Sequence, residues 1–443
     1  MIRYPDGNVI LRNLNRDFPI IDYGKGLYLF DTNGKKYIDA SGGALVTSLG
    51  HGHPKMAQSI YEQLQKVAYV NGTQFTSQAT EELAERLCEK SKKIGLDRAS
   101  FLSSGSEAIE AAIKFVRQLW VERDKPERRK IIARVPSYHG NTLFALSISG
   151  RPHYKKYYGP YLNEKEVCIT SAPYSYRSEV ENYESNGAKH YAKLLEELIE
   201  KEGAESIAAF IFEPIIGSSA AGAVPPEGYF DEVTKICKKN GILLIADEIL
   251  CGSGRTGAFF ACEHFNLNPD VLLLGKGISG GYVALSVLLT KDEYIREMKK
   301  NTGYFMHAQT YMQAPSMTAA GLAALKVFEE ENLISNANQV GEYFHQKMKD
   351  RFLSHPSVGH IDGKGLLLGV EFVKDKKTKT PFTREDKWVE NFTSKAFQNG
   401  LIVWPNVGHI DGKSGDLIVM GPPLNIKKSQ IDEIVEAFEK ILT

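Results

Sequence analysis

Residues 271–281 read VLLLGKGISGG, and this stretch sets the expectation for the whole fold. A continuous apolar run such as Val271–Leu274 is typical of a strand buried on both faces, as in a parallel sheet covered by helices. Lys276 follows this run among glycines, although a lysine is almost never fully buried without a partner. Two interpretations are open at this point: a surface lysine in a glycine-rich turn, or a lysine held at a strand end where it can attack a carbonyl.

Six further apolar runs resemble Val271–Leu274, and these runs alternate with segments of helical periodicity. Strands are expected at 99–102, 131–135, 167–170, 207–212, 242–246, 271–274 and 284–289. Helices are expected at 76–91, before the first of these strands, and at 106–121, 189–202 and 228–240. Strands that alternate with helices predict an α/β fold, here a mostly parallel seven-stranded sheet covered by helices.

The pattern changes after about residue 325. Long amphipathic helices are expected at 336–353, 385–399 and 428–442, and short strands at 366–373, 401–404 and 416–419. Near the start, GLYLFDTNGKKYIDA predicts a hairpin with Asn33-Gly34 at its turn. We therefore expect a large cofactor-binding domain at 51–324 and a smaller α+β domain at 325–443, with residues 1–50 packed against the small domain.

Length and composition exclude several classes of protein. A chain of 443 residues exceeds the size at which one core stops growing, so two domains are expected. Its 54 basic and 54 acidic residues give no electrostatic basis for binding nucleic acid or an anionic membrane. The five cysteines form no CxxC pair, which argues against structural zinc or a disulfide framework. Without a signal-like or membrane-spanning stretch, a cytoplasmic location is expected.

Residues suited to ligand chemistry follow the expected strands. Ser104, Gly105 and Ser106 stand where the first of these strands enters a helix. The free N–H groups and positive dipole of a helix N-terminus suit a phosphate, and glycine permits its close approach. Ser104 and Glu107 also fit a capping box, so a well-capped helix with no ligand is the simpler alternative.

Three other strand ends carry an aromatic ring, a carboxylate and a lysine. Tyr138 and His139 follow one strand, Asp247 ends another, and Lys276 follows a third. In open α/β sheets ligands bind beyond the carboxyl ends of the strands. A phosphorylated aromatic cation that forms an imine with lysine needs these groups, and pyridoxal 5'-phosphate is such a cofactor. His139 has no second ligand at a usual spacing, so no metal site is expected.

The sequence resembles the class III (ω-type) aminotransferases, fold-type I pyridoxal-phosphate enzymes, over nearly its full length. The motifs that carry the resemblance are LYLFDTNGKKYIDASGG, LGHGHP, SSGSEAIEAAIK, SYHGNT, FEPIIG, ADEI, GSGRTG, PDVLLLGKGISGG and MGPPL. The resemblance implies pyridoxal phosphate as cofactor. It also implies transamination, in which an amino group passes from an ω-amino acid or amine to a keto acid such as pyruvate.

The resemblance further implies a role for each matching residue. Lys276 would form the imine with the cofactor and Asp247 would contact its ring nitrogen, which makes these two the catalytic residues. The remaining cofactor-binding residues implied are Ser104, Gly105, Ser106, Tyr138, His139, Glu213, Ile249 and Thr310. Tyr138 and Ile249 would lie against the two faces of the ring. Thr310 would reach the phosphate of the neighbouring subunit, so the resemblance implies a homodimer with shared active sites, and a tetramer is also open.

The substrate stays open at this stage. The resemblance implies a substrate pocket near Leu45, Tyr138 and Trp404, but Val419 stands where some relatives carry an arginine for the substrate carboxylate. One alternative function is a racemase or epimerase, which shares the fold and the lysine but returns the proton to Cα. Another is a catalytically silent binding protein, which would be expected to lack Lys276 or Asp247. Fold alone does not decide between them.

Overall fold

The computed structural model describes residues 1–442, and in this range it contains a seven-stranded sheet and two smaller sheets. The strand order of the large sheet is β4-β10-β9-β8-β7-β5-β6. Its strands are β4 (Arg98–Leu102), β5 (Lys130–Val135), β6 (Val167–Ser171), β7 (Ile207–Phe212), β8 (Leu243–Asp247), β9 (Val271–Leu274) and β10 (Ser286–Thr290). All are parallel to their neighbours except β10, which runs antiparallel to β4 and β9. The predicted α/β fold is confirmed.

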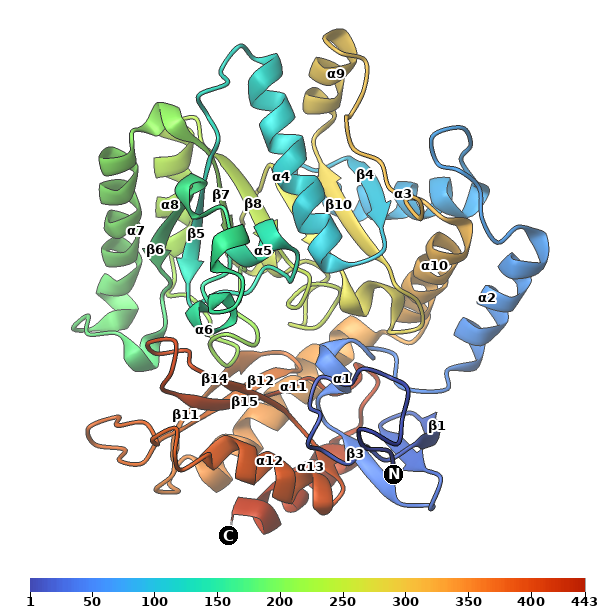
Figure 1. Ribbon diagram of the computed structural model, residues 1–443, viewed down its shortest axis with the longest axis vertical. Coiled ribbons are helices and arrows are strands. Elements are labelled where there is room, and N and C mark those ends of the chain that lie inside the picture. The colour runs from blue at the N-terminus through green and yellow to red at the C-terminus, as the bar shows by residue number, and fades with distance from the viewer. Residues whose placement is uncertain (443) are drawn as a thin grey trace.

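Helices cover both faces of this sheet (Figure 1). They are α3 (Gln78–Ser91), α4 (Gly105–Glu122), α7 (Tyr183–Glu202), α8 (Tyr229–Lys239), α9 (Asp292–Lys300) and α10 (Pro315–Glu330). Successive residues of a strand point to opposite faces. In β7, Phe210 and Phe212 pack in the cluster that includes α7 and α8, whereas Ala209 and Ile211 pack in the cluster that includes α4. Burial on both faces explains why β7 to β9 are apolar at nearly every position.

A second sheet lies in the C-terminal part of the chain. It has the order β11 (Val358–Lys364), β12 (Leu367–Phe372), β15 (Asp416–Met420), β14 (Trp404–Val407), and it is antiparallel. Three helices accompany it: α11 (Leu333–Phe352), α12 (Trp388–Gln398) and α13 (Lys428–Leu442). The single strand predicted at 401–404 is wrong, because the chain leaves one sheet after β13 (Leu401–Ile402) and enters another at Trp404.

The third sheet joins the two ends of the chain. The predicted hairpin forms from β2 (Tyr28–Asp31) and β3 (Lys36–Asp39), and β1 (Ile21–Lys25) pairs with β2. β3 pairs in parallel with β13, so these N-terminal strands lie beside the C-terminal elements (Figure 1). The domain boundaries stay a prediction, and α10 runs across the one placed after residue 324. None of the helices within residues 1–442 has the length and apolarity that a bilayer span requires.

Candidate active site

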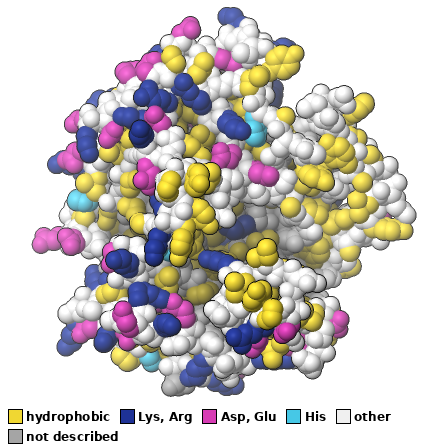
Figure 2. Space-filling view, viewed as in Figure 1, with side chains coloured by type: hydrophobic (Ala, Val, Ile, Leu, Met, Phe, Trp, Pro, Cys, Tyr) yellow, Lys and Arg dark blue, Asp and Glu magenta, His cyan; other side chains and the backbone are white. Residues whose placement is uncertain are grey.

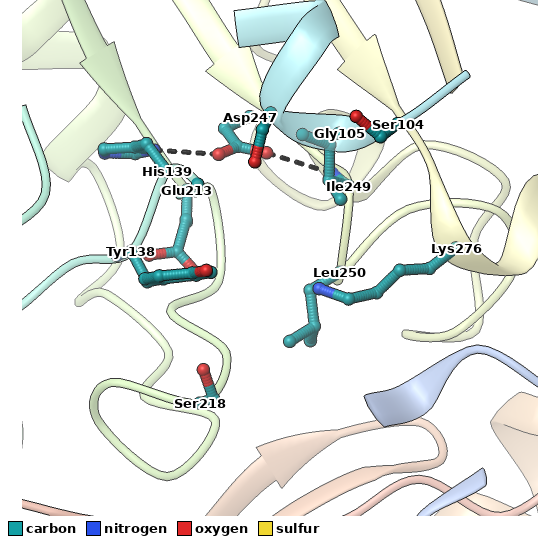
Figure 3. Close-up of a pocket in the computed structure, with 12 residues that line it drawn as sticks. Ser104, Gly105, Tyr138, His139, Glu213, Ser218, Asp247, Ile249, Leu250 and Lys276 are labelled. Carbon is teal, nitrogen blue, oxygen red and sulfur yellow. Dashed lines mark hydrogen bonds and ion pairs between the residues drawn. The ribbon is translucent and has the colours of Figure 1, made fainter. Parts of the chain in front are cut away.

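A cavity of about 190 Å³ opens where β4, β5, β7, β8 and β9 deliver their following residues (Figure 3). Its lining consists of Ser104, Gly105, Ser106, Tyr138, His139, Gly140, Glu213, Ser218, Asp247, Ile249, Leu250 and Lys276. Every cofactor-binding residue predicted from the sequence lines this cavity, except Thr310. Segments separated by more than 170 residues in the chain therefore meet here because the parallel strands end at one edge of the sheet.

The side chain of Lys276 extends into the cavity from the residue that follows β9 and Gly275 (Figure 3). Within residues 1–442, its Nζ atom forms no hydrogen bond or ion pair. Burial lowers the pKa of Lys276 below the ordinary lysine value, although the charges of Asp247 and Glu213 oppose this shift. A side chain at Gly275 would be crowded, because its Cβ would lie 3.0 Å from Ile249 Cγ2 and the Ile249 side chain would have to shift. The glycine thus allows the lysine backbone to approach the wall of the cavity closely.

Asp247 is the last residue of β8 and is buried. Its Oδ2 lies 2.8 Å from Nδ1 of His139, and its Oδ1 accepts a hydrogen bond of 3.1 Å from the Ile249 N–H. An ionised carboxylate only accepts hydrogen bonds, so His139 donates from Nδ1. These two contacts fix the orientation of the carboxylate at the cavity.

Glu213 follows β7 and supports the backbone of Tyr138. Its Oε1 accepts a hydrogen bond of 3.0 Å from the Tyr138 N–H, and its Oε2 accepts one of 3.0 Å from the Gly217 N–H. Burial raises the pKa of Glu213, as does the nearby charge of Asp247, while His139 opposes the shift. Burial also raises the pKa of Tyr138, although the positive charge of Arg151 opposes this shift, so the phenol stays neutral at neutral pH.

Helix α4 begins at Gly105, and Ser104 is its N-cap residue. The Ser104 Oγ accepts a hydrogen bond of 3.3 Å from the Glu107 N–H, as the predicted capping box requires. The second half of that box is wrong, because the Glu107 carboxylate accepts from the Ser103 N–H, one residue before the cap. The first N–H groups of a helix have no partner within the helix, so those of Gly105 and Ser106 remain available at the cavity.

Three predicted residues lie elsewhere. Thr310 is exposed and does not line the cavity of its own chain. Leu45 does not line it either, since it is buried in a cluster that includes Leu417 and Val419. Trp404 begins β14, is half-buried and pairs with Val419. The substrate-pocket role of Leu45 and Trp404 therefore rests on the resemblance alone.

The sequence reasoning missed Gly140, Ser218 and Leu250. Gly140 and Leu250 directly follow predicted site residues, so proximity in the chain could have indicated them. Ser218 belongs to the loop after β7, and no spacing in the sequence marks that it turns toward the cavity.

Comparison with known proteins identifies the family. The family model described as Aminotransferase class-III matches residues 12–442. The "Uncharacterized aminotransferase YodT" of Bacillus subtilis is 36% identical over 432 residues, which cover 98% of this chain and 96% of that protein. The "Gamma aminobutyrate transaminase 3, chloroplastic" of Solanum lycopersicum is 35% identical over 431 residues, with coverage of 96% and 80%.

A solved structure agrees with these relatives. The omega transaminase of Pseudomonas jessenii in complex with PMP superposes with a TM-score of 0.89 at 32% identity, covering 96% of this chain and 92% of that one. Class III aminotransferases use pyridoxal phosphate, whose aminated form is PMP. The chain belongs to the class III aminotransferase family and is a pyridoxal-phosphate-dependent transaminase.

Proposed function

We propose that this transaminase moves an amino group from an ω-amino acid or amine to a keto acid such as pyruvate, with Lys276 as its catalytic base. The observation that supports this proposal most directly is the Lys276 amine, which has no partner within residues 1–442 and faces the same cavity as the Asp247–His139 pair. A surface lysine in a glycine turn would not need to be aimed at a buried carboxylate across a cavity.

The donor set of the cavity fits pyridoxal phosphate. Within residues 1–442, no lysine or arginine nitrogen lies within 4.0 Å of the Asp247 carboxylate, which contacts His139 and suits a protonated ring nitrogen. Gly105 and Ser106, in the first turn of α4, suit the phosphate. Tyr138 and Ile249 supply a flat ring and an apolar side chain for the two faces of the cofactor ring. Glu213 lies close enough to Asp247 and Lys276 to act on both electrostatically.

The proposed mechanism needs two tasks from the protein. When bound, pyridoxal phosphate withdraws electrons from the substrate carbon that bears the amino group and so makes its C–H bond more acidic. Lys276 Nζ then removes that proton as a general base, a role that its burial favours because the neutral amine predominates at lower pH than in free lysine. Asp247, oriented by His139, keeps a negative charge at the other side of the cavity.

The assembly is proposed as a homodimer in which Thr310 completes the neighbouring site. Hydrophobic side chains gather on the side of the molecule where α2 (Pro54–Lys66) lies (Figure 2). The large exposed hydrophobic residues between residues 61 and 75 and between 304 and 311 are Tyr61, Leu64, Val67, Tyr69, Phe75, Tyr304, Met306 and Tyr311. An exposed apolar surface of this kind is typical of a protein–protein interface. We also propose a cytoplasmic location.

The test is the visible absorbance of the protein loaded with pyridoxal phosphate, mixed with single amines and ω-amino acids without an acceptor. We expect the yellow band to bleach with a good donor and to return when pyruvate is added. Loss of optical activity of an amino acid, without bleaching and without need of a keto acid, would instead establish a racemase. Failure to bind the cofactor would identify a silent member of the family.

A further inference from the structure

Arg151 is a buried cation directly behind the wall of the cavity. It precedes α6 (Pro152–Lys155) and is only 5% exposed. Its Nη2 donates to Ser218 Oγ at 2.7 Å, its Nε donates to Ser219 Oγ at 3.1 Å, and its Nη1 donates to Tyr154 Oη at 3.3 Å. Ser218 lines the cavity that Lys276 faces (Figure 3), and its hydroxyl accepts the hydrogen bond from Arg151 Nη2.

The positive charge of Arg151 has no matching negative charge. Within residues 1–442, no carboxylate oxygen lies within 4.0 Å of its guanidinium nitrogens. Among the aspartates and glutamates, Glu213 has the strongest electrostatic effect on Arg151. However, burial raises the pKa of Glu213, and both of its carboxylate oxygens already accept hydrogen bonds from backbone N–H groups. Removing a charge from water is costly unless it is paired, with a penalty on the order of several kcal/mol per ion. A buried guanidinium beside a cavity therefore calls for an anion.

The other buried arginines donate to fixed backbone carbonyls, although Arg134 and Arg255 also have nitrogens without a partner within residues 1–442. Arg128 donates to the carbonyls of Ile207, Asn240 and Gly241 and pairs with Glu205. Arg134 donates to the carbonyl of Glu213, and Arg255 to the carbonyls of Leu366 and Pro422. Among the described residues, Arg151 donates hydrogen bonds only to hydroxyl groups, which can rotate and donate as well as accept. A guanidinium has five N–H donors, and three of them are used here, so two remain for a ligand.

Two aromatic rings fix the position of this guanidinium. Its central carbon lies 4.7 Å from the centroid of Tyr138 and 5.3 Å from that of Tyr154. Arg12 adds a second cation, with Nη2 3.5 Å from Tyr154 Oη. Burial alone would raise the pKa of Tyr154, but the charges of Arg151 and Arg12 lower it below the ordinary value. The surroundings of Tyr138 are therefore electropositive and suited to an anion.

We propose that Arg151, together with the hydroxyl of Ser218, binds the carboxylate of a substrate in the Lys276 cavity. The inference rests on the proposed function and specifies it, because it restricts the preferred substrates to carboxylates. A guanidinium is the group best matched in geometry to a carboxylate, and two donors in one plane fix the orientation of the ligand. The carboxylate belongs either to the amino acid donor or to the keto acid acceptor, and the two half-reactions separate these sources.

The first experiment compares the wild type with Arg151→Gln and Arg151→Lys, each loaded with pyridoxal phosphate. The donor pair is 4-aminobutyrate against 1-aminobutane, and the acceptor pair is pyruvate against propanal. We expect Arg151→Gln to lose about 10- to 100-fold in kcat/KM for the carboxylate member of at least one pair, as for a lost hydrogen bond to a charged group. The member without a carboxylate should change by less than about threefold, and Arg151→Lys should recover part of the loss.

Arg128→Gln is the matched control, because it removes a buried guanidinium that lies away from the cavity. Arg128→Gln should lower thermal stability without altering the ratio of the kcat/KM values for the two substrates in either pair. An equal loss for both members of each pair in Arg151→Gln would overturn the proposal and make Arg151 a positioning residue for Tyr138 and Ser218. No loss for any substrate would overturn it as well.

A binding measurement makes the outcome independent of turnover. Titration calorimetry of the loaded protein with butyrate should detect binding that butanol lacks, and Arg151→Gln should weaken the butyrate affinity about 10-fold or more. A wild type that transfers no amino group but binds butyrate through Arg151 would refute the proposed function and support this inference. Equal butyrate affinity in the wild type and Arg151→Gln would refute the inference.

Discussion

At the scale of single residues, Lys276 combines a reactive side chain with an unusual backbone. Its φ of 46° lies in the left-handed region, which residues other than glycine rarely adopt. Such conformations cost about 1–3 kcal/mol and persist where the surrounding structure enforces them, frequently at functional sites. Here a Cβ on the flanking Gly275 would lie 3.0 Å from Ile249 Cγ2, and the Gly277 carbonyl accepts a hydrogen bond of 2.9 Å from Ser48 Oγ. The backbone is thus fixed on both sides of the lysine.

Replacing this lysine tests its role as the base. We expect Lys276→Ala to reduce turnover by more than about 10²-fold, since a placed proton-transfer group contributes about 10²–10⁴-fold. Lys276→Arg should be nearly as inactive, because a guanidinium does not release its proton in proteins. Amino-group transfer to pyruvate is the measurement, and circular dichroism checks the fold. Lys235→Ala, an exposed lysine on α8, should retain wild-type activity.

The lowered pKa of Lys276 predicts a pH dependence. Only the neutral amine reacts with the cofactor, so the rate at which the apoprotein takes up pyridoxal phosphate should rise with pH and level off above the pKa of Lys276. The midpoint should lie below the ordinary lysine pKa of about 10.4. Asp247→Asn removes a charge that stabilises the protonated amine, so it should move the midpoint to lower pH. A midpoint at the ordinary value, or an upward shift in Asp247→Asn, would contradict this account.

At the scale of secondary structure, the N-terminus of α4 serves both stability and ligand binding. Ser104→Ala removes the cap, and we expect a loss of about 0.5–2 kcal/mol in the free energy of unfolding together with weaker cofactor binding. Ser104→Asp keeps a good capping group but adds a negative charge beside the proposed phosphate site. It should therefore retain stability and still bind pyridoxal phosphate more weakly. Denaturant unfolding and a fluorescence titration with the cofactor separate the two effects.

A cofactor affinity of Ser104→Asp equal to that of the wild type would place the phosphate elsewhere than at α4. Ser103→Ala is a suitable control, because its side chain precedes the cap and does not line the cavity. Its cofactor affinity should be unchanged.

The accuracy of the sequence predictions follows from burial. The central strands of the large sheet were predictable because burial on both faces makes them continuously apolar, as in β7 and β9. The division of 401–404 between two sheets was not, because Val403 gives no turn signal and pairing partners lie far away in the chain. Lys276, Asp247 and Tyr138 follow strands and carry distinctive chemistry. Arg151 lies in the short connection between α5 (Leu143–Ser147) and α6, and Ser218 lies in the loop between β7 and α8, so only the folded structure shows that they meet beside the cavity.

At the scale of the whole molecule, the proposed shared site predicts that two chains with different defects can complement each other. Thr310→Ala should weaken cofactor affinity by about 10-fold, as for a lost hydrogen bond to a charged group. Co-expression of Thr310→Ala with Lys276→Ala should yield mixed dimers in which one site has both intact residues. That site should bind the cofactor with wild-type affinity and transfer amino groups.

The control is a chain that carries both substitutions, co-expressed with Thr310→Ala. In these mixed dimers neither site has both Lys276 and Thr310, so no site can recover wild-type affinity. Light scattering should first give a mass of at least twice the 49.3 kDa of one chain. A monomer, or mixed dimers with no recovered affinity, would refute the sharing of sites through Thr310.

The pairing of β3 with β13 has a consequence for the synthesis of this protein. In the folded protein Ile38 of β3 pairs with Leu401 of β13, but Leu401 is synthesised about 360 residues after Ile38. At about 5–20 residues per second, this interval lasts roughly 20–70 s. During that time one edge of the N-terminal hairpin has no partner, and an unpaired edge is a template for strands of other nascent chains. This unpaired edge is therefore a site where the nascent chain benefits from protection by a chaperone.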